Sequence, residues 1–217
     1  MKTKLMILSI TLISLAVWNM QAMGQEDRYT SAMKSAIEMM DQASDAGEYV
    51  ESANQFERIA TAEKTRWMPY YYASYSLVVM SFDESDGGQK DLILDRAQEL
   101  LDRAMELEPA ESELHVLQAF IFPSRIMVDP MGRGMIYMEK MFGSLEKAKS
   151  LNPENPRSYF LEGVNKLNLP PSMGGGADVA KPILEEALVK FEAFTNEDPL
   201  WPGWGEEATR TELEKLQ

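Results

Sequence analysis

Helices that end at a proline recur along this chain, and they constrain its fold more than any other feature of the sequence. Pro109, Pro153 and Pro199 each follow a stretch whose apolar residues stand three and four positions apart. That spacing is the period of an amphipathic α-helix. Proline ends such a helix because it lacks the backbone N–H and disfavours helical geometry at the residue before it. The pattern predicts a series of tightly connected helices that pack on their neighbours.

Small and apolar residues repeat around these prolines. They stand five and twelve positions before each proline: Ala104 and Ala97, Ala148 and Met141, and Phe194 and Ala187. Ten positions after the first two prolines stand Ala119 and Gly163. We expect helix axes to come closest at the small residues, because a larger side chain would push them apart. Helices are predicted over 27–46, 48–63, 67–82, 91–107, 114–122, 135–151, 158–167, 183–194 and 206–216. With no sustained strand alternation, the fold class is predicted to be all-α.

The repeat resembles the tetratricopeptide repeat (TPR). That family has a bulky residue, a small residue four positions later, and then alanine, an aromatic residue or leucine, alanine and a closing proline. His115 and Ala119, and again Tyr159 and Gly163, fill the bulky and small positions. The resemblance implies a right-handed α-α superhelix, a TPR-like solenoid of about four helical hairpins, with a groove that binds peptides or proteins.

The repeats are longer than the family period of about 34 residues. The step from Pro109 to Pro153 is 44 residues, and the step from Pro153 to Pro199 is 46. The additional residues fall between the two helices of a hairpin, in the segments 81–91, 123–134 and 168–181. We expect three long intra-repeat loops along one edge of the solenoid. They either form a binding edge or close over their own core.

The first 24 residues have the layout of a secretory signal peptide. Two lysines precede an uncharged apolar run over 5–17, which is shorter than the roughly 20 residues that span a bilayer. Small residues then stand before Gln25. We expect residues 1–24 to be a cleaved signal peptide, with an uncleaved anchor as the alternative, and 25–217 to be a single TPR-like domain. The protein would then be periplasmic or secreted, as an exported bacterial member of the family.

Composition excludes several functions. The net charge of −14 leaves no basic stripe for nucleic acid, and it disfavours an anionic membrane surface after signal cleavage. No cysteine is present, so thiol chemistry and disulfides are excluded. The single histidine, His115, is expected in a packed core or groove. Residues 83–88 resemble a calcium loop, but Gly87 and Leu94 stand where oxygen ligands are required. We therefore predict no enzyme, metal or cofactor, unless carboxylates converge under the loops.

Two functions stay open at this point. The first is an exported, non-catalytic protein–protein interaction module that holds a protein or peptide partner, for which the acidic charge favours a basic one. The residues expected to bind this partner are Tyr70, Ser74, Val116, Phe120, Phe160 and Val164 in the groove, and Arg125 and Arg133 on the loop edge. Residues 201–204 would cap the open end of the stack, followed by a polar capping helix over 206–216.

The alternative function is small-ligand binding in the service of an envelope transport system. The long loops would then close over an apolar pocket lined by Met131, Met135, Met173, Tyr137 and Phe160. A closed apolar cavity would favour this ligand binder, whereas an open groove would favour the interaction module.

Overall fold

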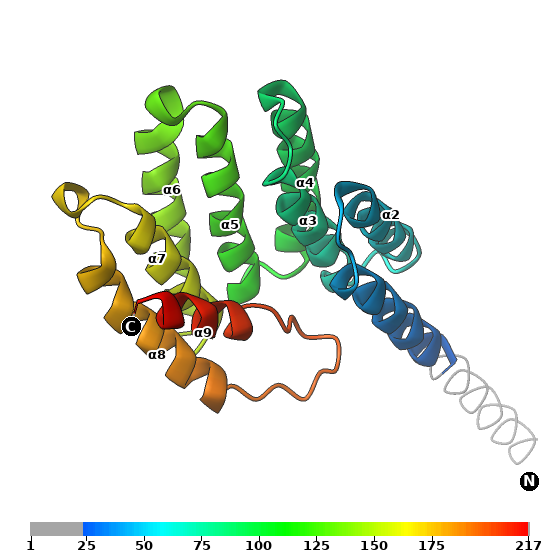
Figure 1. Ribbon diagram of the computed structural model, residues 1–217. Coiled ribbons are helices and arrows are strands. Elements are labelled where there is room, and N and C mark those ends of the chain that lie inside the picture. Colours follow the sequence, from blue (N-terminus) through cyan, green and yellow to red (C-terminus); the bar gives the residue numbers. More distant parts are fainter. Residues whose placement is uncertain (1–23, 217) are drawn as a thin grey trace, which may run out of the picture.

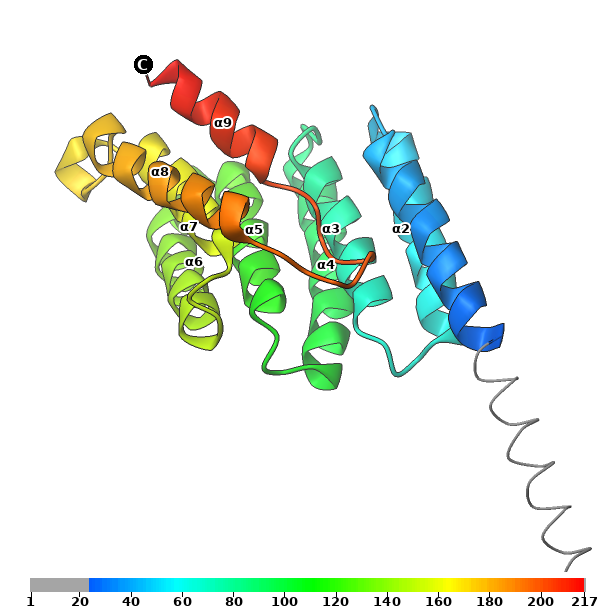
Figure 2. The same cartoon turned by 90° about the horizontal axis from the view of Figure 1, so that it is seen from below.

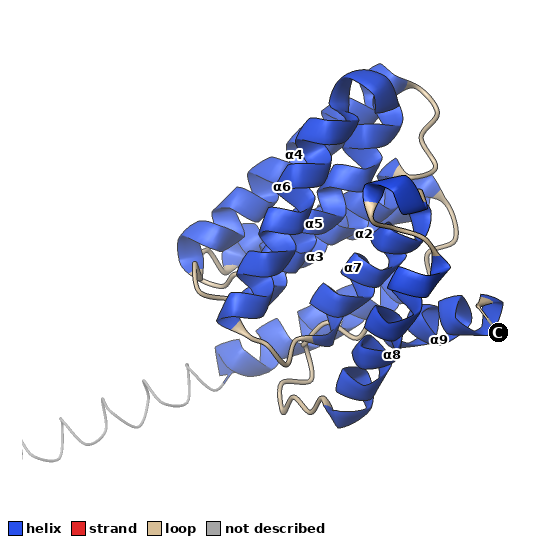
Figure 3. Cartoon of the chain, turned by 90° about the vertical axis from the view of Figure 1, so that its left-hand side faces the viewer, coloured by secondary structure: helices blue, strands red, loops and turns tan. Residues whose placement is uncertain are grey.

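The regular structure of this protein is helical throughout residues 24–216, which are the residues that the computed structural model describes (Figures 1 and 3). No strand occurs in this range, which confirms the predicted all-α class. The cleavage prediction concerns a segment that, apart from Gly24, lies outside the described residues. Within them, no helix combines the length and the apolar character needed to cross a membrane.

Consecutive helices lie side by side along the chain. A helical segment over 24–41 precedes α2 (Ala46–Ala62), α3 (Met68–Ser81), α4 (Gly87–Leu107), α5 (Ser112–Val128), α6 (Pro130–Leu151), α7 (Pro156–Asn168), α8 (Ala177–Ala193) and α9 (Glu206–Lys215). The most extensive contacts join α5 to α6, α7 to α8, and α3 to both α2 and α4. The hairpin pairing agrees with a helical-repeat layout, whereas the right-handed superhelix and membership of the TPR family stay predictions.

Local chemistry explains most helix boundaries. The helices α4 and α6 end two residues before Pro109 and Pro153, as predicted. The side chains of Asp45, Asp86 and Asp129 accept backbone N–H groups at the starts of α2, α4 and α6. The third proline does not act in this way, because α8 already ends at Ala193, well before Pro199.

The prediction of a long loop is wrong for the first two segments, 81–91 and 123–134. In the segment 81–91, α4 already begins at Gly87. In the segment 123–134, α5 continues through Pro123 to Val128, and α6 begins at Pro130. We expected the glycines and prolines in these segments to break the helices. Instead, aspartate caps and the packing of α5 on α6 extend the helices. The third segment does contain a loop, with a short 3-10 helix, η1 (Pro171–Met173).

Two hydrophobic clusters form the core, and α5 contributes to both. The larger cluster includes Met33, Phe56, Tyr71, Leu94, Leu101, Leu114 and Leu117, and the smaller includes Val116, Met141, Leu145 and Leu161. The predicted small positions are confirmed as buried contacts: Ala97, Ala104, Ala148 and Ala187 are fully buried. A Cβ atom on Gly163 would lie 2.6 Å from Cδ2 of Leu184 in α8. The closest helix approaches therefore occur where the sequence placed them.

Candidate ligand-binding site

Residues 194–205, between α8 and α9, form an extended connection that we call the C-terminal strap. It leaves α8, passes α5, reaches the vicinity of α3 and returns to α9 (Figure 2). The Trp201 ring packs edge-on against Trp67, with 5.7 Å between ring centroids. The Tyr72 hydroxyl donates a hydrogen bond of 2.8 Å to the Leu200 carbonyl. The prediction that 201–204 caps the end of the stack is therefore wrong, because its indole rings find aromatic partners on the middle helices.

Trp204 fills the space where the sequence predicted a partner groove. Its ring stacks on Tyr75 at 5.3 Å and on Phe120 at 5.7 Å, and it meets Phe160 edge-on at 6.3 Å between centroids. Its indole Nε1 donates to the Tyr71 hydroxyl oxygen at 2.8 Å. The predicted groove residues Phe120 and Phe160 thus contact the protein's own strap.

A buried arginine holds the strap in this position. Arg157 donates from Nε to the Trp204 carbonyl at 2.9 Å, and it also donates to the Pro202 carbonyl. Its Nη1 pairs with Oε1 of Glu113 at 3.0 Å, and the two side chains are only 3% and 0% exposed. Burial raises the pKa of Glu113, and the adjacent Arg157 opposes that rise. This ion pair connects α5, α7 and the strap within one desolvated site.

The prediction of partner binding is wrong for two residues, because their side chains are fully buried. Ser74 is fully buried, and its hydroxyl donates to the Ala97 carbonyl at 2.8 Å. Val116 is fully buried in the smaller core cluster. Both face neighbouring helices, so neither side chain can contact a partner. Tyr70 and Val164 are half-buried, and whether they bind a partner stays a prediction.

The two predicted loop-edge arginines form ion pairs within the protein. Arg125 pairs with Asp91 at 3.1 Å and with Asp95 at 2.6 Å, while Arg133 pairs with Asp91 at 2.7 Å. The hydrogen bond from Arg133 is the main cause that lowers the pKa of Asp91. Arg125 lowers this pKa further, against the opposing effect of burial. These guanidinium groups join α4 to α5 and α6.

Replacing Asp91 with asparagine should reduce the free energy of unfolding by about 1 kcal/mol at pH 7. A carboxylate whose folded pKa is depressed stabilises the protein above its unfolded pKa, and that stability is lost as the pH falls through the folded pKa. Urea unfolding at pH 7 and at pH 2.5 should show the difference between wild type and variant only at pH 7. An equal difference at both values would contradict the charge-based explanation.

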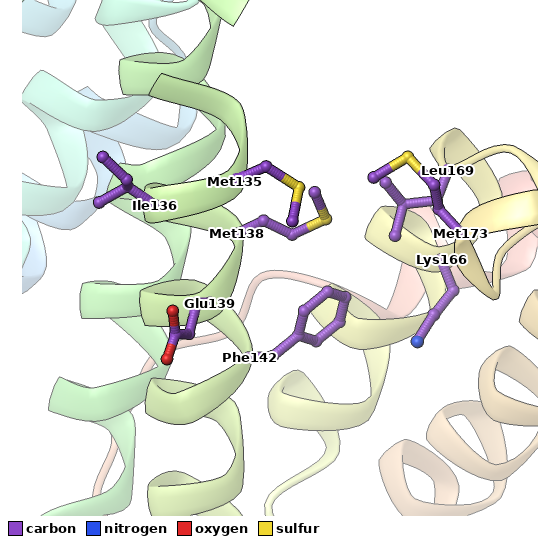
Figure 4. A pocket seen from close by; sticks show the side chains of 8 residues that line it. All are labelled: Met135, Ile136, Met138, Glu139, Phe142, Lys166, Leu169 and Met173. Atoms are coloured by element: carbon purple, nitrogen blue, oxygen red, sulfur yellow. The ribbon is translucent and has the colours of Figure 1, made fainter. Parts of the chain in front are cut away.

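A cleft of about 620 Å³ opens between α6 and the connection from α7 to α8. Its lining is mainly apolar and comprises Met135, Ile136, Met138, Glu139, Phe142, Lys166, Leu169 and Met173. In Figure 4, Met135, Met138 and Phe142 extend from α6 toward Met173, Leu169 and Lys166. Met135 is 71% exposed and Met173 is 46% exposed, which is unusual for side chains of this type. We call this the methionine cleft.

The cleft contains part of the pocket predicted for a ligand binder. Met135 and Met173 line it, as the alternative interpretation expected. Met131 is 96% exposed outside the cleft, Tyr137 stacks on Phe122, and Phe160 contacts Trp204. Sequence reasoning missed Met138, Phe142, Lys166 and Leu169. Helical spacing could have indicated them, because Met138 and Phe142 follow Met135 on one face of a helix, and Lys166 and Leu169 stand three positions apart.

Three consecutive glycines shape one wall of the methionine cleft. Gly174 and Gly176 have φ values of 74° and 99°, a region that favours glycine. A Cβ atom on Gly175 would lie 2.5 Å from the Lys166 carbonyl oxygen. The loop can therefore close tightly on the end of α7, which places Met173 opposite α6. Gly174 and Gly176 thus give the segment 168–181 a tight turn with positive φ.

Lys166 gives the cleft a positive charge beside an apolar surface. Its Nζ lies 4.7 Å from the centroid of the Phe142 ring, and it forms no ion pair within residues 24–216. The carboxylate of Glu139 also lines the cleft, so its mainly apolar surface carries one cationic and one anionic side chain. An apolar cavity of this size with a few polar groups is typical of small-molecule sites. The site fits an amphiphilic ligand with a broad apolar body and an acidic group. The described residues contain no group of three or more His, Cys, Asp or Glu side chains that could hold a metal ion.

The described residues form an all-α protein with an open, methionine-lined cleft. Among solved structures, the chain is similar to the HusA haemophore from Porphyromonas gingivalis, with 30% sequence identity and a TM-score of 0.79. The similarity covers 87% of this chain and 92% of that chain. The chain belongs to the same family as HusA. No protein-family model matches the chain, and no curated protein matches it either.

Proposed function

We propose that this protein is an exported, non-catalytic haem-binding protein that holds a porphyrin in the methionine cleft. The observation that carries the proposal is the likeness to a haemophore over nearly the full length of both chains, together with an apolar cleft of suitable size. The likeness to a haemophore favours the ligand-binding alternative over the interaction module. The cleft itself is open, so the closed cavity that this alternative predicted is not found there. The strap supports the same choice, since Trp204 occupies the groove that a peptide would need.

The chemistry of haem matches the cleft. A porphyrin presents two broad apolar faces and an edge with two carboxylates. The methionine side chains are flexible and polarisable, so they can adapt to the flat ring, and Phe142 offers an aromatic surface. Lys166 stands where it can pair with a propionate group. Thioether groups ligate haem iron in cytochromes c. The affinities for haemin and for iron-free protoporphyrin can therefore be compared to test whether these methionines contact the iron.

Replacing Met135 and Met138 together with glutamine should weaken haemin binding by at least about tenfold, because polar amides replace apolar contacts with the ring. Replacing Lys166 with glutamine should weaken it by about fivefold through loss of one ion pair. The change in Soret absorbance during titration with haemin measures both effects. A parallel titration with iron-free protoporphyrin shows how much of the affinity depends on the metal.

Matched variants control for general effects of the substitutions. Met131→Gln changes another exposed methionine of α6 that lies outside the cleft, and Lys140→Gln removes a lysine of α6 that does not line it. Both should bind haemin as the wild type does. Unchanged affinity in the cleft variants would refute the assignment of the porphyrin to this cleft.

A further inference from the structure

A second cavity lies beneath the C-terminal strap. It has a volume of about 490 Å³, and its walls come from the strap, from α2 and α3, and from the helical segment 24–41. None of its lining residues lines the methionine cleft. We call it the strap cavity, because Pro199, Trp201, Gly203 and Trp204 of the strap form one side of it.

Aromatic rings dominate the walls of the strap cavity. They belong to Tyr49, Tyr72, Tyr75, Trp201 and Trp204. Tyr75 and Trp204 stack at 5.3 Å, and Tyr72 is fixed by its hydrogen bond to the strap. Burial raises the pKa of Tyr72 and of Tyr75, so both phenols stay neutral at physiological pH. Other rings stack on the faces of Tyr72, Tyr75 and Trp204, whereas no ring of the described residues stacks on Tyr49 or Trp201. Tyr49 and Trp201 therefore offer the electron-rich faces, and the phenols add hydroxyl oxygens without a phenolate charge.

The only charged side chain that lines the cavity is Asp41. It lies at the exposed rim, and it forms no ion pair with any residue of the described part of the chain. Burial is the main cause that raises the pKa of Tyr49, and the negative charges of Asp83 and Asp41 raise it further, so Asp83 adds a second negative charge near this wall.

Arg157 lies with its guanidinium carbon 5.5 Å from the centroid of the Trp204 ring, and it pairs with Glu113. Burial is the main cause that raises the pKa of Tyr72 and of Tyr75, and the charge of Arg157 acts in the opposite direction. Negative charge is therefore concentrated at the rim of the cavity, where Asp41 lies among its lining residues.

We propose that the strap cavity binds a small organic ammonium ion, with the aromatic rings around its alkyl groups and Asp41 as the counter-ion. An ammonium ion near tyrosine and tryptophan faces gains cation–π attraction, and quaternary ammonium groups are recognised in aromatic cages for this reason. A neutral ligand of the same shape would gain only the apolar contact. The inference is independent of haem binding, because the two sites share no residue.

Choline and its neutral isostere 3,3-dimethylbutan-1-ol provide the probes, and the fluorescence of Trp201 and Trp204 provides a local signal. We expect choline to change this fluorescence saturably and the alcohol to bind at least about tenfold more weakly. Asp41→Asn should weaken choline binding by about fivefold and leave the alcohol unaffected. Glu38→Gln, an exposed change one turn earlier that does not line the cavity, should behave as the wild type.

Equal binding of the two probes, or no saturable response to choline, would overturn the proposal. Binding of choline that Asp41→Asn leaves unchanged would overturn the role of the carboxylate. Haemin titration of the same Asp41 variant should match the wild type. Failure of the ammonium site and failure of the haem proposal therefore give different results.

Discussion

Replacing Arg157 with methionine should lower the free energy of unfolding by about 3–5 kcal/mol, the largest loss that we expect from a single substitution here. The change leaves Glu113 fully buried without its cationic partner. It also removes the hydrogen bonds to the strap carbonyls of Trp204 and Pro202. Urea unfolding measures the loss. The tryptophan emission of the folded variant should shift to the red, because Trp204 loses its anchored position.

A comparison with an exposed pair tests whether burial is the cause. Arg103 pairs with Glu106 on the surface, with side chains 54% and 62% exposed, so Arg103→Met should cost less than about 1 kcal/mol. The double variant with Glu113→Leu and Arg157→Met should be more stable than Arg157→Met alone, because no unpaired charge stays buried. A loss in Arg157→Met no larger than in Arg103→Met would contradict this account.

Gly163→Ala should destabilise the protein by about 1–3 kcal/mol, because the methyl group overpacks the contact between α7 and α8. The added Cβ would lie 2.6 and 2.7 Å from two side-chain carbons of Leu184, and 3.4 Å from its backbone nitrogen. Because the backbone nitrogen of Leu184 is also close, a change of the leucine rotamer alone does not make room, and α7 and α8 have to separate. Thermal or urea unfolding measures the loss.

Gly143→Ala is the matched control for this overpacking. Gly143 lies inside α6, is exposed, and has no atom within 4 Å of the position of an added Cβ. The same substitution should therefore stabilise the protein by about 0.5–1 kcal/mol, through the higher helix propensity of alanine. If Gly163→Ala also stabilises the protein, helix propensity, rather than the contact with Leu184, decides the outcome.

The predicted helix contacts followed from local chemistry. Ala97, Ala104, Ala148 and Gly163 stood at a fixed distance from a proline, and all are buried where neighbouring helices approach. Such a pattern is local, because a helix must bury one face and can approach closely only at small residues. The errors over 81–91 and 123–134 have the same local origin. Glycine and proline predicted long loops there. Instead, Asp86 caps α4 after the short connection 82–86, and Asp129 alone separates α5 from α6.

The candidate sites depend on contacts that no local pattern contains. The hydrogen bond from Tyr72 to Leu200 joins residues 128 positions apart, and the one from Trp204 to Tyr71 spans 133. Met135 and Met173 could be expected in a ligand pocket, because Met173 stood in a predicted loop and Met135 directly followed one. Lys166 could not, since its role depends on the glycine loop, which closes on the end of α7 and places Met173 opposite α6.

The sequence by itself determined the all-α class, the ends of α4 and α6, and the small residues at helix contacts, because these follow from helix period and backbone sterics. Only the tertiary structure decided that the strap fills the predicted groove with Trp204 and that a methionine cleft opens beside α6. Those outcomes depend on which distant surfaces bury the most aromatic and apolar area together, and the buried Arg157 then makes one arrangement preferable to the others.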